Sequence, residues 1–327
     1  MSGKITSLAG YVPERIVTNE ELSKSVDTSD EWIVSHTGIR ERRIAREDQA
    51  ASDLAIQAAQ RVLAQRDLAP EFVEMVVVAT SSPDYAPFPA TASIVQDRLG
   101  CTSAGAFDLQ AGCTGFVDAL EVARALVGIG RSGNVLAIGS EKLSSIANWN
   151  DRSTCVLFGD GAGAALVEPE PAEGHEIIDS YLRSDGSGDT ALIRELGGSR
   201  IPYDPNRLSE SESKLAMDGK RVYLFAVDAI LRTVGELVNR SGISLEEVRW
   251  IVPHQANLRI IEAAAKRLKL SPDRFYTNLD RYANTSAASI PLALEEMEQE
   301  ALLSRGDLIL TVGFGAGLTY GGNLIRW

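Results

Sequence analysis

The chain has 327 residues, 44% of them hydrophobic and 24% charged, a composition ordinary for a globular protein with a large buried core. Its formal net charge of −13 argues against a general nucleic-acid binder, because binding to the phosphate backbone needs a basic surface. No apolar run reaches the roughly 18–20 residues of a membrane span, and the first residues lack the basic and apolar regions of a secretory signal.

The cysteine content indicates a compartment. Cys101, Cys113 and Cys155 are odd in number and form no C-x-x-C pair, so neither a disulfide framework nor a zinc site is expected. The sequence therefore predicts a protein of the reducing cytoplasm.

Two stretches of the chain show the same order of elements. The first runs from an amphipathic helix near residues 52–65 through a turn to a buried strand at Met75–Ala79. The second runs from a helix near residues 222–241 to a strand at Val248–Pro253. Each continues with a helix, a strand, a tight turn and a second helix, and then a turn and another strand. The offset between matching segments stays near 171–175 residues, which indicates a duplication.

The duplication predicts the fold class and its division. We expect an α/β protein of mainly parallel sheets covered by helices, with halves at residues 1–170 and 216–327. Residues 171–215 are rich in turn-forming and polar residues and are interpreted as a connecting insertion. Ligands of parallel sheets gather at the carboxyl ends of strands. Three such ends carry distinctive residues, namely Cys113, His254 and Asn284.

Cys113 lies in "DLQAGCTGFVDAL", where an apolar strand is followed by residues at helical spacing. This predicts a position in the first turn of a helix, where the dipole favours the nucleophilic thiolate. Gly112 and Gly115 would allow the backbone to bend and a substrate carbonyl to approach. The alternative is a buried structural cysteine, the interpretation we give to Cys101 and Cys155.

His254 and Asn284 are ambiguous when each is taken alone. His254 follows the apolar strand of "RWIVPHQAN" and is either a site residue or a hydrogen-bonded core residue. Asn284, in "RYANTSAAS", precedes a helix and is also an ordinary N-cap candidate. The glycine-rich "GDGAGAA" and "GFGAG" lack the Lys-Ser/Thr ending of a nucleotide-binding loop, so close backbone packing is expected there. The second could also supply N–H groups to an oxyanion.

Taken together, these motifs resemble the condensing enzymes of the thiolase fold, most closely the β-ketoacyl-acyl carrier protein synthase III family. The matching segments span nearly the whole chain in the family's order: "TSDEWIVSHTGIRERRIA", "GCTGF", "FGDGAGAA", "VPHQANLRI", "NTSAAS" and "GFGAG". The resemblance implies a thiolase-like fold with two duplicated halves in α-β-α-β-α layers. It also implies an acyltransferase that starts fatty acid synthesis and needs no metal or redox cofactor.

The resemblance implies a mechanism in two half-reactions. A short acyl-CoA transfers its acyl group to Cys113. His254 and Asn284 then hydrogen-bond the thioester carbonyl of malonyl-acyl carrier protein while it loses CO₂, and the enolate attacks the acyl group. The backbone N–H groups of Cys113 and Ala316 would stabilise the oxyanion.

The family pattern also implies binding residues. Trp32 and Arg152 would hold the CoA adenine, and Thr28 would hydrogen-bond its edge. Phe88 would shape the acyl pocket of the neighbour in a homodimer. The acidic carrier protein would dock on a basic helix after "PHQAN", although a solvated helix face is the alternative. Its expected contacts are Gln255, Ala256, Asn257, Leu258 and Arg259, with Lys266, Arg267 and Lys269 nearby.

Some positions depart from the family pattern, and three rival functions remain. His36 replaces an arginine at the CoA phosphate, Lys220 and Tyr223 replace residues near the pantetheine tunnel, and Ala316 replaces a glycine. The donor's chain length and branching stay open. A sister synthase could prime a specialised pathway or use a medium-chain donor. A non-catalytic subunit is disfavoured by the intact site residues, and a thiol hydrolase leaves "NTSAAS" and "GFGAG" unexplained.

Overall fold

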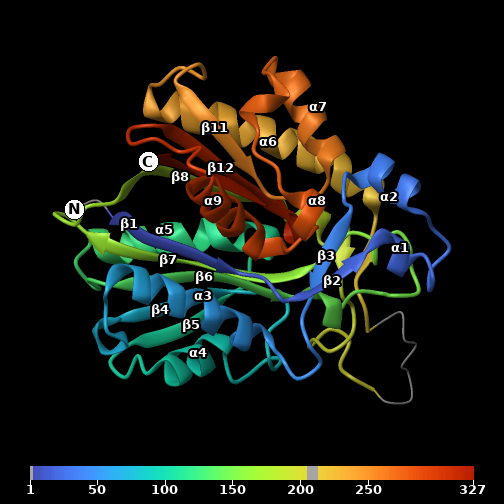
Figure 1. The fold of residues 1–327 in the computed structure, drawn as a ribbon, viewed down its shortest axis with the longest axis horizontal. Coiled ribbons are helices and arrows are strands. Elements are labelled where there is room, and N and C mark those ends of the chain that lie inside the picture. The colour runs from blue at the N-terminus through green and yellow to red at the C-terminus, as the bar shows by residue number, and fades with distance from the viewer. Residues whose placement is uncertain (1–2, 205–212) are drawn as a thin grey trace.

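The structure, a computed structural model, describes residues 3–204 and 213–327. Within these residues nine strands form one mixed sheet in the order β11-β12-β13-β8-β1-β7-β6-β4-β5 (Figure 1). Their bounds are β1 (Gly3–Tyr11), β4 (Met75–Ala79), β5 (Gly105–Leu109), β6 (Val135–Lys142), β7 (Asp160–Pro169), β8 (His175–Ser184), β11 (Val248–Pro253), β12 (Leu308–Gly315) and β13 (Thr319–Arg326).

Two small sheets lie outside the large one. One pairs β2 (Arg15–Thr18) with β3 (Glu41–Ile44), and the other pairs β9 (Leu192–Ile193) with β10 (Ala216–Met217). The α-helices are α1 (Asn19–Leu22), α2 (Asp30–Thr37), α3 (Ala51–Arg66), α4 (Thr91–Leu99), α5 (Gly115–Gly128), α6 (Gly219–Ser241), α7 (Leu258–Leu268), α8 (Leu279–Tyr282) and α9 (Ser289–Gln299). No helix within the described residues is long and apolar enough to cross a membrane.

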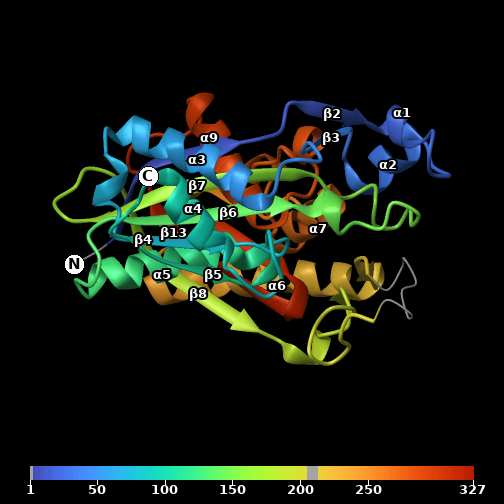
Figure 2. The same ribbon diagram turned by 90° about the horizontal axis from the view of Figure 1, so that it is seen from below.

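The large sheet consists of two parts joined by a narrow seam. β1 pairs with β7 along its whole length but with β8 only at Lys4↔Glu176 and Ile5↔His175. From this seam the two parts diverge, and α5 and α9 pack between them. Helices α3 and α4 cover the outer face of the N-terminal part. On the other side α6 covers the C-terminal part and α7 packs on α6 (Figures 1 and 2). The predicted α-β-α-β-α layers are thus confirmed.

The predicted strands and helices near the two matching stretches are present, but the pairing differs from the prediction. Only β4–β5, β4–β6 and β11–β12 are parallel among the described pairs of the large sheet, and the others are antiparallel. The prediction of mainly parallel sheets is therefore wrong, because β7 and β13 each return alongside the preceding strand. In the second stretch, the strand expected between a helix and a tight turn is reduced to an isolated bridge between Phe275 and Ile251.

The central strands are buried on both faces because helices cover both sides of each part. Every residue of β12 is buried, as are all residues of β6 except the last. The glycines of "GDGAGAA" allow close packing here, as expected. A Cβ at Gly163 would lie 2.5 Å from the Pro291 side chain, so the strand passes against α9 without a side chain between them.

The division into halves remains a proposal. We propose that the N-terminal half ends near residue 170 and that β8 belongs with the C-terminal half, since β8 pairs with β13 along its length. The sequence assigned β8 to the connecting segment 171–215. Residues 205–212 of that segment lie outside the described residues.

Candidate active site

Cys113 lies where the N-terminal half turns from strand to helix. The strand β5 ends at Leu109, the one-turn 3₁₀ helix η2 spans Gly112–Thr114, and α5 begins at Gly115. Gly112 has a φ of 56°, which glycine adopts without strain. A Cβ at Gly315 would lie 2.6 Å from the Cys113 nitrogen, so the end of β12 packs directly on the cysteine backbone.

The protonation state of Cys113 differs from the prediction. Its side chain is 8% exposed, and burial raises the pKa of the thiol to about 12, although contact with Ser286 opposes this shift. The expected resting thiolate is therefore wrong, since burial disfavours the charged form of the thiol. The residue precedes α5 rather than lying in its first turn.

His254 follows β11, and its ring is held in the core. It is 1% exposed, its backbone N–H donates to the Val312 carbonyl, and its Nδ1 lies 2.7 Å from the hydroxyl of Ser289. Burial lowers the pKa of the imidazole to about 3. The ring is neutral at physiological pH, so it can donate one hydrogen bond but carries no charge.

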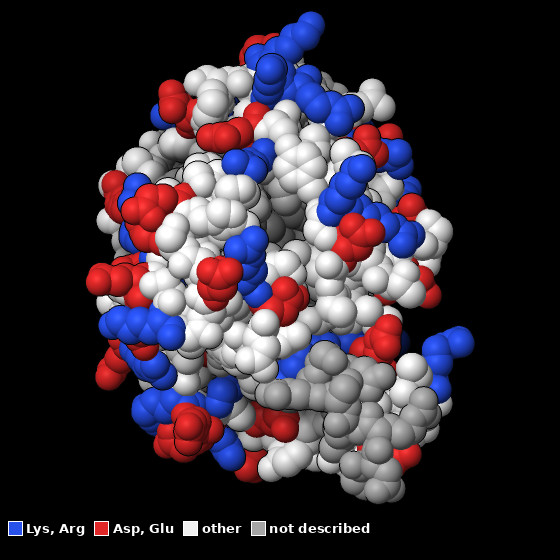
Figure 3. Space-filling view, turned by 90° about the vertical axis from the view of Figure 1, so that its right-hand side faces the viewer, with Lys and Arg blue, Asp and Glu red and all other residues white. Residues whose placement is uncertain are grey.

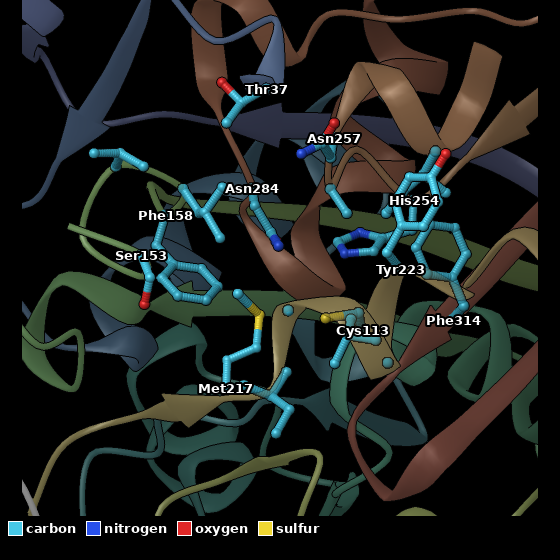
Figure 4. A pocket seen from close by; sticks show the side chains of 18 of the residues that line it. Thr37, Cys113, Ser153, Phe158, Met217, Tyr223, His254, Asn257, Asn284 and Phe314 are labelled. Atoms are coloured by element: carbon cyan, nitrogen blue, oxygen red, sulfur yellow. The ribbon is translucent and has the colours of Figure 1, made fainter. Parts of the chain in front are cut away.

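Asn284 is fixed by backbone contacts on both sides. Its N–H donates to the Leu157 carbonyl, and its own carbonyl accepts from the Gly159 N–H. The side-chain oxygen accepts a hydrogen bond from the Ser286 N–H at 2.8 Å. The amide nitrogen is thereby turned toward the cavity, as Figure 4 shows.

One cavity of about 260 Å³ brings the three side chains together, with Cys113, His254 and Asn284 facing the same space (Figure 4). Figure 3 shows the face that carries α2 and α7, which has a hollow flanked by Lys and Arg side chains. The remaining lining is mostly apolar and includes Trp32, His36, Val156, Leu157, Phe158, Leu192, Met217, Val222, Tyr223, Ile260 and Phe314. Tyr223, noted above as a departure from the pattern of the resembled family, has its side chain in the lining of this cavity. The other departure on this segment, Lys220, is exposed.

Backbone strain is concentrated beside Asn284. Ala283 has φ 56° and ψ −156°, a conformation that is almost restricted to glycine, and Ser286 has a φ of 47°. The surrounding contacts hold both residues in place, because Asn284 is tied to residues 157 and 159. This backbone conformation, together with the hydrogen bond from the Ser286 N–H, sets the direction of the Asn284 side chain.

We predict that Ala283→Gly stabilises the protein by about 1 kcal/mol, because relief of the backbone strain exceeds the added flexibility of glycine. Urea unfolding measures the change. Ala293→Gly is the matched control, since this alanine is equally buried but lies in α9. It should lose about 1 kcal/mol. Equal losses in both variants would contradict the strain argument.

The predicted CoA-binding residues form a stack at the cavity mouth. The ring of His36 lies on one face of Trp32, with centroids 4.4 Å apart, and the Arg152 guanidinium lies 5.0 Å from the Trp32 ring. Arg152 also donates to the Asp27 carbonyl at 3.1 Å. Thr28 follows Asp27 in the chain but does not line the cavity, and its hydroxyl oxygen is buried with no hydrogen-bond partner among the described residues.

The second predicted oxyanion donor, Ala316, lies beside η2. A Cβ added to Gly112 would be 3.2 Å from the Ala316 nitrogen. The positive φ in "GFGAG" falls at Gly317, at 123°, whereas Ala316 is absent from the described non-glycine residues with positive φ. The alanine that replaces the family's glycine is therefore accommodated.

The predicted docking residues divide into buried and exposed ones. Gln255 is 1% exposed and bonds the Pro253 and Tyr276 carbonyls, so its side chain is inaccessible to a docked protein. This corrects its assignment to the docking surface. Asn257 caps α7 and donates to the His36 carbonyl, while Ala256 and Leu258 are half-buried. The exposed residues among those predicted are all basic, namely Arg259, Lys266, Arg267 and Lys269, although the acidic Glu262 of α7 is exposed as well.

Phe88 lies apart from the cavity, in a loop between β4 and α4. It is 77% exposed, and Tyr85 in the same loop is 58% exposed. The edge strand β5 lies in the same half and exposes Phe107 at 39%. Each of these three large aromatic side chains is exposed to solvent in the isolated chain.

Two buried polar residues near the site, Ser289 and Glu141, were not predicted from the sequence. Ser289 contacts His254, and nothing in "NTSAAS" distinguishes it from the neighbouring small residues. Glu141 is fully buried and accepts from the Ser81 N–H and the Ser82 hydroxyl. Burial raises its pKa. A charged residue near the end of the apolar strand "NVLAIGSE" was a usable signal for Glu141.

This fold, with a cysteine and a histidine at equivalent edges of two related sheet parts, places the protein among the condensing enzymes of the thiolase fold. Family models agree. The model of 3-oxoacyl-[acyl-carrier-protein] synthase III matches residues 107–186, and that of its C-terminal region matches residues 238–327.

Individual relatives cover nearly the whole chain. The β-ketoacyl-[acyl-carrier-protein] synthase III of Caldanaerobacter subterraneus subsp. tengcongensis is 50% identical, across 99% of this chain and 97% of that protein. The crystal structure of the Thermus thermophilus synthase III is 47% identical with a TM-score of 0.91, across 99% of both chains. The priming β-ketosynthase of the R1128 polyketide pathway is 34% identical with a TM-score of 0.90, across 99% of this chain and 96% of that one. The chain belongs to the β-ketoacyl-acyl carrier protein synthase III family, whose members are acyltransferases.

Proposed function

We propose that the protein joins a short acyl group from acyl-CoA to malonyl-acyl carrier protein, the priming condensation of fatty acid synthesis, with Cys113 as the nucleophile. The observation that carries this proposal is the shared cavity of Cys113, His254 and Asn284. In the first half-reaction the Cys113 sulfur bonds to the acyl carbon, and the bond from that carbon to the CoA sulfur breaks. The thiol proton passes in net to the departing CoA.

The two neutral donors serve the second half-reaction. The bond between the malonyl methylene and its carboxylate breaks, CO₂ leaves, and the electron pair moves onto the thioester oxygen as an enolate. The His254 ring and the Asn284 amide donate hydrogen bonds to that oxygen. The enolate carbon then bonds to the acyl carbonyl, and the Cys113 sulfur departs and regains a proton. The N–H groups of Cys113 and Ala316 stabilise the intermediate oxyanion.

The stack of Trp32 with His36 and Arg152 at the cavity mouth supports binding of the CoA adenine. An adenine between Trp32 and Arg152 needs about 7 Å, which is two van der Waals contacts. The guanidinium therefore has to move outward by about 2 Å from its position 5.0 Å above the ring. The buried hydroxyl of Thr28 has no hydrogen-bond partner among the described residues, so it is free to bond the adenine edge once a local movement exposes it.

The exposed basic residues of α7 support docking of the carrier protein beside the mouth. Carrier proteins are strongly acidic, so this local positive surface offsets the overall charge of −13. Arg259 lies in the first turn of α7, the same helix whose cap Asn257 contacts α2 at the cavity mouth.

We predict that Arg259→Glu raises the KM for malonyl-acyl carrier protein about tenfold, because like charges now face the carrier. Self-acylation by acetyl-CoA should stay near its parental rate. Steady-state kinetics with each substrate varied in turn measures both effects. Arg131→Glu is the matched control. Arg131 is exposed and precedes the amino end of β6, whereas Cys113 and His254 follow the carboxyl ends of their strands. Equal losses with both substrates would contradict docking at Arg259.

A homodimer is the assembly that best covers the apolar loop and the open strand β5. An exposed strand edge is a ready template for pairing with a second copy. Phe88, 77% exposed here, would be buried against the neighbour and would shape its acyl pocket. Sedimentation velocity should give twice the monomer mass, and a monomer at micromolar concentration would exclude this assembly.

Three free buried cysteines fit the proposed cytoplasmic location, where thiols stay reduced.

A sister synthase that primes a specialised pathway is the second candidate function. The 34% identity to the priming ketosynthase of a polyketide pathway favours keeping it. A donor panel from acetyl- to decanoyl-CoA plus branched acyl-CoAs, with malonyl-acyl carrier protein as acceptor, separates the two. A preference for acetyl or short branched donors supports fatty acid priming. A medium-chain preference supports the sister synthase, and no product with any donor would end both proposals.

A further inference from the structure

The hydroxyl of Ser289 occupies a position between a backbone donor and the catalytic ring. Ser289 is the first residue of α9 and is 2% exposed. Its Oγ lies 2.7 Å from Nδ1 of His254 and accepts a hydrogen bond from the Gln255 N–H at 3.4 Å. Within the described residues, the Ser289 hydroxyl has no other hydrogen-bond partner than His254 Nδ1 and the Gln255 N–H.

These contacts decide which nitrogen of His254 carries the proton. Because the Gln255 N–H can only donate, the Ser289 oxygen accepts there with one lone pair. Among the described residues the hydroxyl proton has no acceptor other than Nδ1 of His254, so donation to the ring is the arrangement that leaves no buried hydroxyl proton unpaired. Nδ1 then accepts that proton's hydrogen bond. In the neutral ring the remaining proton must be on Nε2, the nitrogen that Ser289 does not contact.

We propose that Ser289 is a positioning residue that fixes the Nε2–H tautomer of His254, so that the ring donates a hydrogen bond into the cavity. This inference rests on the proposed function, in which His254 is a donor during decarboxylation. In the other tautomer Nε2 would present a lone pair to the enolate oxygen, and the two would repel each other.

The same short segment orients both donors of the second half-reaction. The Ser286 N–H holds the Asn284 oxygen at 2.8 Å and so turns the amide nitrogen toward the cavity. Three residues later the Ser289 hydroxyl performs the equivalent task for His254. The segment Asn284–Ser289 therefore provides one donor directly and sets the direction of the other.

The test uses the full-length protein with ¹⁵N-labelled histidine and three variants. Ser289→Ala removes the hydroxyl, and Ser289→Thr keeps it. Thr285→Val is the matched control, since the Thr285 hydroxyl is 1% exposed, lies in the same segment and has no hydrogen-bond partner in the structure. The chain has three histidines, so the His254 signal is assigned by its loss in His254→Ala.

In the parental protein, Thr285→Val and Ser289→Thr, the ¹⁵N shifts of His254 should show a protonated Nε2 and an unprotonated Nδ1. Ser289→Ala should shift the proton partly or wholly to Nδ1. Its decarboxylation of malonyl-acyl carrier protein should fall about tenfold, the equivalent of one hydrogen bond. Self-acylation by acetyl-CoA should be unchanged, which a folding defect would not allow.

The outcomes separate this inference from the proposed function. If Ser289→Ala retains the Nε2–H tautomer, or decarboxylates at the parental rate, the role of Ser289 is overturned. If Thr285→Val loses as much decarboxylation as Ser289→Ala, the effect is general to the segment and the role is overturned as well. If His254→Ala decarboxylates at the parental rate, the proposed function of His254 fails, whatever the tautomer.

Discussion

Cys113→Ala should take up no acyl group from acetyl-CoA, because the alanine methyl cannot form a thioester. Cys113→Ser should acylate at least about a thousandfold more slowly, since a hydroxyl at neutral pH is a far weaker nucleophile than a thiol. Intact-mass spectrometry after incubation with acetyl-CoA measures the adduct. This is the largest effect expected of any single change in the protein.

Cys101→Ala is the control for this experiment. Cys101 is fully buried in the N-terminal half and is absent from the residues that line the cavity, so its loss should leave acylation intact. An acetyl adduct on another residue, with Cys113 unmodified in the parental protein, would defeat the assignment of the nucleophile.

The second large effect separates the half-reactions. His254→Ala and Asn284→Ala should each slow decarboxylation of malonyl-acyl carrier protein by about a hundredfold or more, the usual consequence of removing an oxyanion donor. Acylation of Cys113 should persist in both variants, since neither donor is assigned to the first half-reaction. Release of ¹⁴CO₂ from labelled malonyl-acyl carrier protein and the intact mass of the enzyme report the two steps separately.

A variant that combines His254→Ala with Asn284→Ala tests whether the two donors act on the same oxygen. If both donors contact the same oxygen, their effects are coupled, and removing the second should cost less than removing the first. Decarboxylation at the parental rate in either single variant would refute the assignment of that residue. Loss of acylation in both would instead place them in the first half-reaction.

The positions of the site residues follow from local sequence patterns. Strand-like runs end just before Cys113 and at Pro253, immediately before His254, and the observed strands β5 and β11 end at or near these points. The duplication places equivalent turns at matching edges of the two parts of the sheet. Apolar periodicity therefore sufficed to bring Cys113 and His254 toward one location.

Protonation states and contacts could not be predicted in the same way. The pKa of Cys113 depends on how completely the Gly315 segment and the cavity walls exclude water, which no local pattern reports. Gln255 is adjacent in sequence to exposed residues, but its side chain turns inward to the Tyr276 carbonyl. Ser289 acts across a distance of 35 residues in the chain, so only the folded arrangement shows its contact with His254.

The protonated thiol has a consequence for survival under oxidative stress. Hydrogen peroxide attacks thiolates, and burial that raises the pKa of the Cys113 thiol keeps the thiolate scarce at pH 7. An idle enzyme should therefore resist conversion of Cys113 to sulfenic acid. The burial that suppresses ionisation of the Cys113 thiol should therefore also protect this thiol from oxidation while no acyl donor is bound.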